Sequence, residues 1–350
     1  MRLPMAGEAI DAAIGERMVD EALAAGLNYF DTAYMYHGGE SEKFAGAALA
    51  RHPRDSFMLA SKMPLWMAKD AADMERIFAE QLERCRTPYF DFYLVHAMSA
   101  DKAQKFRDWR VGEFLDRKKA EGKIRHAGCS FHDTPEALRE VLTLYPWEFT
   151  QIQLNYLDWN LYRSREQYEA LVAAGIPVIV MEPVRGGALA NLTPEAVAVF
   201  RRHAPEASPA SWAMRFAASL PGVVCVLSGM SSLAQMRDNL RTFSPLKPLA
   251  DVERAALEEA LAAYRKGLAV PCTACRYCQP CPAGVEIPTV FGHYNQYKAS
   301  GNQGAFKAHY QSLPEKGRAE ACVACGQCVA VCPQHIDVPA RLREIAAAAA

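Results

Sequence analysis

The chain has 350 residues, of which 51% are hydrophobic and 23% charged, and its formal net charge is −1. This composition predicts one large domain plus a small one, and it excludes a disordered chain. The near-zero charge argues against nucleic acid as the main partner. No apolar run reaches the ~18 residues that span a bilayer, and residues 1–5 lack the apolar core of a signal peptide. We therefore expect a cytoplasmic protein with neither a nucleic-acid nor a membrane partner.

Residues 11–242 alternate between helix-like and strand-like segments. Predicted strands end at or near residues 31, 62, 96, 130, 154, 181 and 228. Predicted helices follow them, at residues 41–51, 71–84, up to 122, from 134, 165–174 and 231–241. Helices between successive strands imply parallel pairing, so the fold class is α/β, a (β/α)8 TIM barrel.

The count of eight needs a strand before the first helix, which begins near residue 11. Only residues 1–5 are available for it, and Pro4 lies among them. Either this strand is a stub or the sequence lacks its N-terminus, and we favour the second interpretation. We expect a barrel over residues 1–245, a linker helix over 246–270, a small helical, cysteine-rich domain over 271–341 and an Ala-rich tail over 342–350.

Four ionisable side chains stand at the ends of three consecutive predicted strands. Asp31 and Tyr36 follow the first, Lys62 closes the second and His96 the third. Parallel neighbours in a barrel bring such residues to one mouth. A Lys ammonium beside a Tyr hydroxyl lowers its pKa, an Asp holds the Lys, and a neutral His binds a substrate oxygen. Each residue alone could be a helix cap or a solvated strand end, but four at successive strand ends favour catalysis of carbonyl protonation.

These residues lie in motifs that resemble the aldo-keto reductases over roughly residues 10–242. The matching pieces are Asp31-Thr32-Ala33-Tyr34-Met35-Tyr36, Ser61-Lys62, Leu94-Val95-His96 and Gly128-Cys129-Ser130. The resemblance implies that Tyr36 is the general acid/base and Lys62 modulates its pKa. It also implies that Asp31 is the partner of Lys62 and that His96 orients the substrate.

The same resemblance implies a nicotinamide site at the tips of the later strands. Ser130 matches the family Ser, and Gln153 fits the family Gln, with Gln151 as the alternative. Two positions depart from the family. Phe131 stands where Asn is common, and Met181 stands where an aromatic residue stacks on the nicotinamide.

The expected phosphate end of the site follows the last strand, where small residues lead into a helix. The candidate residues are Gly229, Ser231, Gln235 and Asn239. NADP-specific members of the family often carry Lys and Arg at the positions of Gly229 and Gln235. NAD(P)H is therefore expected, but a preference for NADP is not supported, unless Arg237 or Arg241 substitutes. The Arg185-Gly186-Gly187 sequence is either a further phosphate contact or a surface turn.

Eight of the eleven cysteines form two groups near the C-terminus. Clustered cysteines in a chain without an export signal indicate metal ligands. The first group is Cys272, Cys275, Cys278 and Cys281, and the second is Cys322, Cys325, Cys328 and Cys332. The second group has the bacterial ferredoxin spacing, and the first is one residue shorter before its last Cys. We expect two 4Fe–4S clusters rather than zinc, which needs only four ligands, or disulfides.

In two-cluster ferredoxins the fourth Cys of each run ligates the other cluster. That pattern joins Cys332 to the first three cysteines of the first group, and Cys281 to the first three of the second. The spacing leaves this exchange open. We expect Tyr294, Tyr297 and Phe306 to form the core of a helical insert, and the other three cysteines, Cys85, Cys129 and Cys225, to be core thiols.

The whole architecture resembles the aldo-keto reductases with a C-terminal ferredoxin-type domain. It implies an oxygen-sensitive oxidoreductase that transfers hydride between a nicotinamide and a small carbonyl or alcohol, coupled to iron–sulfur electron transfer. A ferredoxin or another redox protein is the candidate partner. Hydride carries two electrons and each cluster one, and no motif indicates a flavin that would convert between them. The alternatives are purely structural clusters, or a redox-sensing or partner-binding module with a non-catalytic barrel.

Overall fold

The computed structural model describes residues 2–265, 269–272 and 275–350. Contacts between residues group the chain into two compact units. The first comprises Met1–Pro183 and Met214–Pro248, and the second comprises Val184–Ala213 and Leu249–Ala350. The bounds of these two units differ from the bounds of the predicted domains. The predicted domains describe functional parts of the chain, and they stay predictions. No helix in the described ranges is long and apolar enough to cross a membrane.

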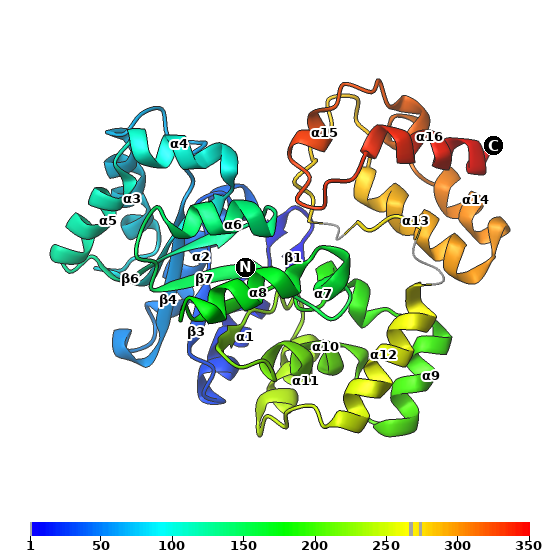
Figure 1. Cartoon of the computed structure of the whole chain (residues 1–350), viewed down its shortest axis with the longest axis horizontal. Coiled ribbons are helices and arrows are strands. Elements are labelled where there is room, and N and C mark those ends of the chain that lie inside the picture. Colours follow the sequence, from blue (N-terminus) through cyan, green and yellow to red (C-terminus); the bar gives the residue numbers. More distant parts are fainter. Residues whose placement is uncertain (1, 266–268, 273–274) are drawn as a thin grey trace. The chain divides into compact units, whose positions relative to one another are not determined.

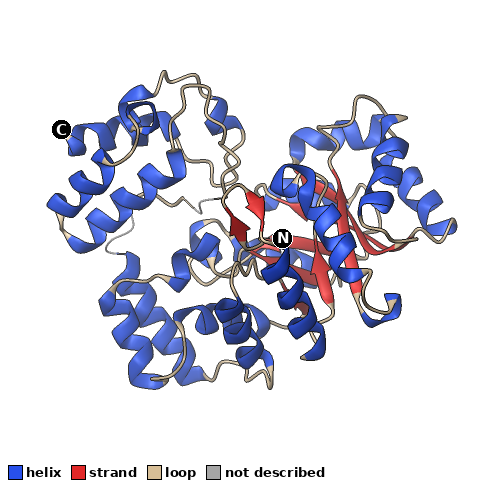
Figure 2. Ribbon diagram, turned by 180° about the vertical axis from the view of Figure 1, so that it is seen from behind, coloured by secondary structure: helices blue, strands red, loops and turns tan. Residues whose placement is uncertain are grey.

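The first unit is built on a curled sheet of seven parallel strands, paired in sequence order from β3 to β9 (Figures 1 and 2). These strands are β3 (Tyr29–Asp31), β4 (Met58–Met63), β5 (Phe90–Met98), β6 (Ile124–Phe131), β7 (Phe149–Gln153), β8 (Val178–Met181) and β9 (Val223–Val226). The predicted alternation of strands and helices and the TIM-like fold class are confirmed.

The expected first strand does not join this sheet. Residues 5–6 form β1 (Met5–Ala6), which pairs antiparallel with β2 (Ala9–Ile10) in a hairpin. Within the described chain, residues 2–5 therefore supply no strand to this sheet, which contradicts the interpretation of a stub strand. A strand that contains Pro4 lacks one backbone donor, which disfavours a central position in a sheet.

Helices connect and flank the strands of the first unit. They are α1 (Ala12–Ala24), α2 (Glu40–Leu49), α3 (Asp73–Arg84), α4 (Ala100–Asp108), α5 (Val111–Ala120), α6 (Pro135–Leu142), α7 (Asp158–Leu161), α8 (Ser164–Ala173) and α11 (Leu233–Phe243), with short 3-10 turns η1 (Tyr36–Gly39) and η2 (Arg54–Ser56). α10 (Pro209–Ala218) crosses from the second unit into the first. Met18 and Ala22 of α1 pack on Met236 of α11, so the first and last helices of the repeat meet.

The interior of the sheet is filled by side chains from several strands. Ala60, Leu94, Phe149 and Ile179 form one buried cluster. Gly128 is required here, because a Cβ at this position would lie 2.6 Å from the Phe149 ring. A filled interior leaves the strand ends as the places where polar side chains can gather.

The second unit contains the turn η3 (Arg185–Ala190) and a set of helices. These are α9 (Pro194–His203), α12 (Asp251–Arg265), α13 (Ile287–Ser300), α14 (Gln303–Gln311), α15 (Gln327–Ala330) and α16 (Val338–Ala349), with 3-10 turns η4 (Glu315–Gly317) and η5 (Ala319–Ala321). α9 and α12 lie side by side (Figure 1).

The cysteine region has its own hydrophobic core. Phe291 of α13, Phe306 of α14 and Leu342 of α16 are among its buried members. Tyr297 stacks on Phe306 at 5.1 Å, and Tyr294 lies 5.9 Å from the same ring. The prediction that these aromatic residues form the core of a helical insert is confirmed.

Candidate functional site

The centre of the site is an ion pair between neighbouring strands. Lys62 near the end of β4 places its Nζ 2.6 Å from Oδ1 of Asp31, the last residue of β3, and donates to the carbonyl oxygen of Thr32 at 2.8 Å. Lys62 is fully buried. Burial lowers the pKa of Lys62, and the charge of Asp31 opposes that shift. The carboxylate therefore holds an ammonium where water cannot solvate it.

Tyr36 begins the η1 turn and lies against this pair. The Nζ of Lys62 is 4.8 Å from the centroid of the Tyr36 ring. Part of the side chain stays accessible, but surrounding protein desolvates the phenol. The pKa of Tyr36 is raised well above its usual value by burial, and further by Asp31 and Glu182. This is the opposite of the lowering expected from Lys62, because burial is the largest cause of the shift. The phenol therefore stays protonated and has a proton to donate.

His96 of β5 completes the group that the sequence predicts. Its ring lies 5.8 Å from the Tyr36 ring and 5.0 Å from Trp66, whose side chain is exposed. Burial, and next the charge of Lys62, lower the pKa of His96 well below its usual value, so the imidazole is neutral. Within the described residues, its buried Nδ1 has no hydrogen-bond partner. The neutral imidazole of His96 can bind a substrate oxygen.

The pKa of His96 leads to a prediction about stability. Burial also lowers the pKa of His132 to about 4. Both imidazoles stay neutral in the folded chain at pH values where the unfolded chain protonates them. The unfolded state then binds more protons, so the free energy of unfolding is expected to fall below about pH 6.5, by about 1.4 kcal/mol per pH unit for each histidine. Urea unfolding between about pH 7 and pH 5 measures this slope.

A matched pair of variants assigns the effect. His96→Gln and His132→Gln are each expected to reduce the slope, because each removes one buried neutral imidazole. Equal slopes for wild type and His96→Gln would contradict the buried neutral imidazole.

The two candidate glutamines have different neighbours. Nε2 of Gln151 donates to Oδ2 of Asp31 at 3.1 Å, whereas Nε2 of Gln153 donates to Asp158 at 2.8 Å. Both side chains point to the same face of β7, so periodicity alone does not separate them. The structure thus brings the alternative Gln151, rather than Gln153, into the Asp31–Lys62 group.

Ser130 and Met181 lie at the ends of β6 and β8. Oγ of Ser130 accepts a hydrogen bond from the Ala97 amide at 2.8 Å. Gln153 pairs with Met181 across β7 and β8. These candidate cofactor residues therefore stand at the same ends of the sheet as the catalytic candidates.

The other cofactor candidates share the loop after β9 and the start of α11. The Ser231 amide donates to Oε1 of Gln235 at 2.8 Å, and Nδ2 of Asn239 donates to Oγ of Ser228 at 2.8 Å. A Cβ at Gly229 would lie 2.8 Å from the side chain of Arg2.

The cations near this loop are paired with carboxylates. Arg2 lies 3.7 Å from Glu182. The two arginines that could replace the missing charges are also engaged: Arg237 binds Glu21 at 2.8 Å and Arg241 binds Asp238 at 2.9 Å. An arginine of this group that bound the 2′-phosphate of NADP would have to leave its carboxylate partner.

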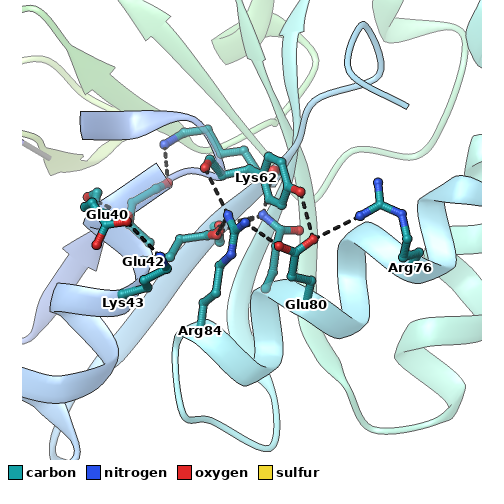
Figure 3. Close-up of polar contacts among 12 residues, drawn as sticks. Glu40, Glu42, Lys43, Lys62, Arg76, Glu80 and Arg84 are labelled. Atoms are coloured by element: carbon teal, nitrogen blue, oxygen red, sulfur yellow. Dashed lines mark hydrogen bonds and ion pairs between the residues drawn. The ribbon is translucent and has the colours of Figure 1, made fainter. Parts of the chain in front are cut away.

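A buried polar network behind Lys62 was not predicted (Figure 3). Oε1 of Glu42 in α2 accepts from Oγ of Ser61 at 2.5 Å and from Nε2 of Gln81 at 2.8 Å. Gln81 also donates to the carbonyl oxygen of Lys62 at 2.9 Å. Burial raises the pKa of Glu42, while Ser61, Gln81 and Arg84 oppose the shift. The network fixes the backbone that carries Lys62. The one feature that could have predicted this network is the burial of Ser41 and Glu42 on α2.

The eight clustered cysteines separate into two sets. One cavity of the second unit is lined by Cys272, Cys275, Cys278 and Cys332, together with apolar residues such as Phe291. Burial, and next the neighbours Cys275, Cys272 and Cys332, raise the pKa of Cys278 to about 12. The first set thus gains its fourth member, Cys332, from the second run.

The second set is centred on Cys328. Its pKa is raised by burial and by Cys322, Cys325 and Cys281. Within the described part of the chain, no three Cys, His, Asp or Glu side chains converge closely enough for a single metal ion. Four thiols spaced around a cavity lined by apolar side chains fit a four-iron cluster better than one zinc ion. Of the scattered thiols, Cys85 and Cys129 are buried in the core, as predicted.

The curled parallel sheet gathers a buried ionic group at its strand ends, where barrels of this type keep their chemistry, and the cysteine runs have ligand spacings close to those of ferredoxins. The model of the Aldo/keto reductase family matches residues 1–262, and the chain belongs to this family. The model of the 4Fe-4S dicluster domain matches residues 271–336. The chain is thus an aldo/keto reductase-type oxidoreductase with a C-terminal 4Fe–4S domain.

Curated relatives include L-galactose dehydrogenase of Arabidopsis thaliana, 26% identical over 277 residues that span 72% of this chain and 85% of that protein. Methylglyoxal reductase YeaE of Escherichia coli is 28% identical over 243 residues, 67% of this chain and 80% of that protein. Both relatives are named for chemistry on small carbonyl or alcohol compounds.

Similar solved structures include the holo form of aldo-keto reductase AKR11C1 from Bacillus halodurans, with a TM-score of 0.62, 24% identity, and coverage of 74% of this chain and 91% of that one. An aldo/keto reductase from Klebsiella pneumoniae in complex with NADP and acetate has a TM-score of 0.61 and 24% identity, and covers 73% of this chain and 86% of that one. At these identities the likeness shows the fold alone.

Proposed function

We propose that the barrel transfers hydride between NAD(P) and a small carbonyl or alcohol, with Tyr36 as general acid/base. The observation that supports this most is the protonated phenol of Tyr36 beside the Lys62–Asp31 pair and the neutral His96. The names of the relatives support the substrate class. The experiment that tests it is anaerobic nucleotide oxidation in the presence of small carbonyls.

The side chains divide the chemistry among them. When bound, a reduced nicotinamide supplies the hydride that reaches the carbonyl carbon. The Tyr36 hydroxyl gives its proton to the carbonyl oxygen, and the neutral imidazole of His96 orients that oxygen. Lys62 stabilises the resulting phenolate, and Asp31 keeps Lys62 charged. In alcohol oxidation the phenolate takes the proton back.

We propose that Ser130, Met181 and Gln153 lie near the bound nicotinamide. Gln151, which contacts Asp31, is the alternative to Gln153. Gly229, Ser231, Gln235 and Asn239 would face the phosphates and adenosine. Positions 229 and 235 hold Gly and Gln, so neither supplies a cation for the 2′-phosphate of NADP. These positions therefore give no reason to prefer NADP over NAD. Both nucleotides therefore enter every assay.

The cysteines would hold two 4Fe–4S clusters, one on each set of four thiols. The reducing cytoplasm would keep these thiols from forming disulfides. Bound clusters supply single-electron transfer. We propose that they exchange electrons with the barrel chemistry, the two electrons of one hydride being divided between the two clusters with release of one proton, and that they pass these electrons to or from a ferredoxin or another redox protein. Titration of anaerobic, iron-reconstituted protein with NADH and with NADPH tests the coupling. Reduction of the clusters by either nucleotide supports it, and reduction by dithionite alone contradicts it.

A structural role for the clusters is the second candidate. Cys272, Cys278, Cys281, Cys322, Cys328 and Cys332 pack against the hydrophobic core of the second unit. Removal of iron would then unfold this unit, as it does in metal-dependent small domains. The nucleotide titration separates the two roles, because a structural cluster takes no electron from NADH or NADPH.

The exchanged ligand pairing makes a prediction about double variants. Cys275→Ser and Cys332→Ser are expected to damage the same cluster, so the double variant keeps one intact cluster, about four irons. Cys325→Ser with Cys332→Ser is expected to lose both. Iron analysis and electron paramagnetic resonance measure the outcome. If each run held its own cluster, the two double variants would behave in the opposite way.

A further inference from the structure

The Arg185-Gly186-Gly187 sequence, a candidate phosphate contact, does not place its arginine at a surface. Arg185 is fully buried within the second unit. Its Nη2 donates to the carbonyl oxygen of Pro271, the residue before Cys272. The arginine therefore contacts the chain at the point where the first cysteine run begins.

The local backbone is shaped to turn Arg185 inward. Arg185, Gly186 and Gly187 all have positive φ, at 50°, 64° and 99°. The amides of Gly187 and Leu189 both donate to the Val184 carbonyl, at 3.0 and 3.1 Å. Positive φ at a non-glycine residue is unfavourable and persists where the surrounding structure demands it. The two glycines allow the tight turn, and Arg185 accepts an unfavourable conformation.

The segment that Arg185 contacts is also held by α13. Oδ1 of Asn295 accepts from the amides of Ala269 and Val270, at 3.1 and 2.7 Å, and its Nδ2 donates to the Val270 carbonyl at 2.7 Å. The Cys272 amide donates to the same carbonyl at 2.8 Å. Asn295 and Arg185 thus fix the backbone around Cys272 from two elements.

Arg185 also brings a permanent positive charge to this place. A guanidinium cannot lose its proton in a protein. In a buried environment its charge acts strongly on nearby groups, because little water screens it. Cys272 lines the cavity shared with Cys275, Cys278 and Cys332. A four-iron cluster there gains one negative charge when it accepts an electron, so a buried cation favours the reduced form.

We propose that Arg185 is a positioning residue for Cys272 and raises the reduction potential of the cluster held by the Cys272 set. The inference rests on the proposed function, since it requires that these cysteines hold a cluster. It assigns the Arg185-Gly186-Gly187 turn to the iron–sulfur centre rather than to the nucleotide.

A redox titration followed by electron paramagnetic resonance tests this proposal. It is made in a Cys325→Ser background, in which only the cluster of the Cys272 set remains. Arg185→Gln is expected to make reduction about tenfold less favourable, which lowers the midpoint potential by about 59 mV for a one-electron couple. Arg341→Gln is the matched control, because Arg341 of α16 belongs to the same unit but is exposed and paired with Glu344 at 2.7 Å. This control is expected to keep the potential.

Two further variants separate position from charge. Asn295→Ala is expected to speed the loss of iron to a chelator without moving the potential. If Arg185→Gln binds no iron, Arg185→Lys decides, since it keeps the charge and is expected to keep the potential. An unchanged potential in Arg185→Gln, an equal shift in Arg341→Gln, or a lowered potential in Arg185→Lys would overturn the proposal. Absence of iron from the Cys325→Ser parent would instead refute the cluster assignment.

Discussion

Replacing Tyr36 by phenylalanine is expected to lower kcat for carbonyl reduction by a factor of about 10² to 10⁴, the usual contribution of a general acid. The ring of Tyr36 remains between Lys62 and His96 in this variant, and only the proton donor is lost. KM is expected to change little, because His96 still binds the substrate oxygen. Steady-state kinetics with both nucleotides measure the effect.

Tyr34→Phe is the matched control. Tyr34 lies in the same sequence motif, but its hydroxyl donates to Glu80 at 2.8 Å instead of facing the Lys62–Asp31 pair. We expect this variant to keep its rate. The Tyr36→Phe variant also separates an enzyme from a redox-sensing module, which would keep its cluster signal and partner binding but has no turnover to lose. Equal rates for Tyr36→Phe and wild type would refute the role of Tyr36.

Asp31→Leu is expected to destabilise the barrel by about 3 kcal/mol, because it leaves the buried Lys62 without its counter-ion. Lys62 would then release its proton in the folded state. The unfolded chain still binds that proton below about pH 10.4, so the stability of the variant is expected to rise with pH. Urea unfolding followed by tryptophan fluorescence measures both effects.

A double variant tests the cause. Asp31→Leu combined with Lys62→Met removes both charges, and we expect it to recover most of the lost stability. Both variants are expected to lose turnover, since neither can stabilise the Tyr36 phenolate. If the double variant were as unstable as Asp31→Leu alone, the loss would come from packing rather than from an unpaired buried charge.

Much of the fold and of the catalytic group could be predicted from local signals. Apolar runs of strand length ended near Asp31, Lys62 and His96, and parallel strands bring such ends together. Cysteine spacing predicted the iron–sulfur domain in the same way, because ligands of one cluster lie close along the chain.

The rest depends on contacts between distant segments, which a local pattern does not carry. The choice between Gln151 and Gln153 depends on which one reaches Asp31, 120 residues away in sequence. The sequence of the turn at Arg185 fits a surface turn and a phosphate contact equally well. The contact that distinguishes it is made with Pro271, 86 residues away in sequence. The raised pKa of Tyr36 also follows from burial, which spacing does not show.

The most direct test of the central claim, hydride transfer by the barrel, uses NADH and NADPH deuterated at C4. The anaerobic, iron-reconstituted protein is incubated with either nucleotide and with methylglyoxal or other small carbonyls, and the alcohol products are analysed by mass spectrometry. Our account predicts that deuterium appears on the former carbonyl carbon with wild type, and at a rate about 10² to 10⁴ times lower with Tyr36→Phe. Oxidation of the nucleotide with cluster reduction but without deuterium in any product would contradict it, because the electrons would then leave through the clusters alone.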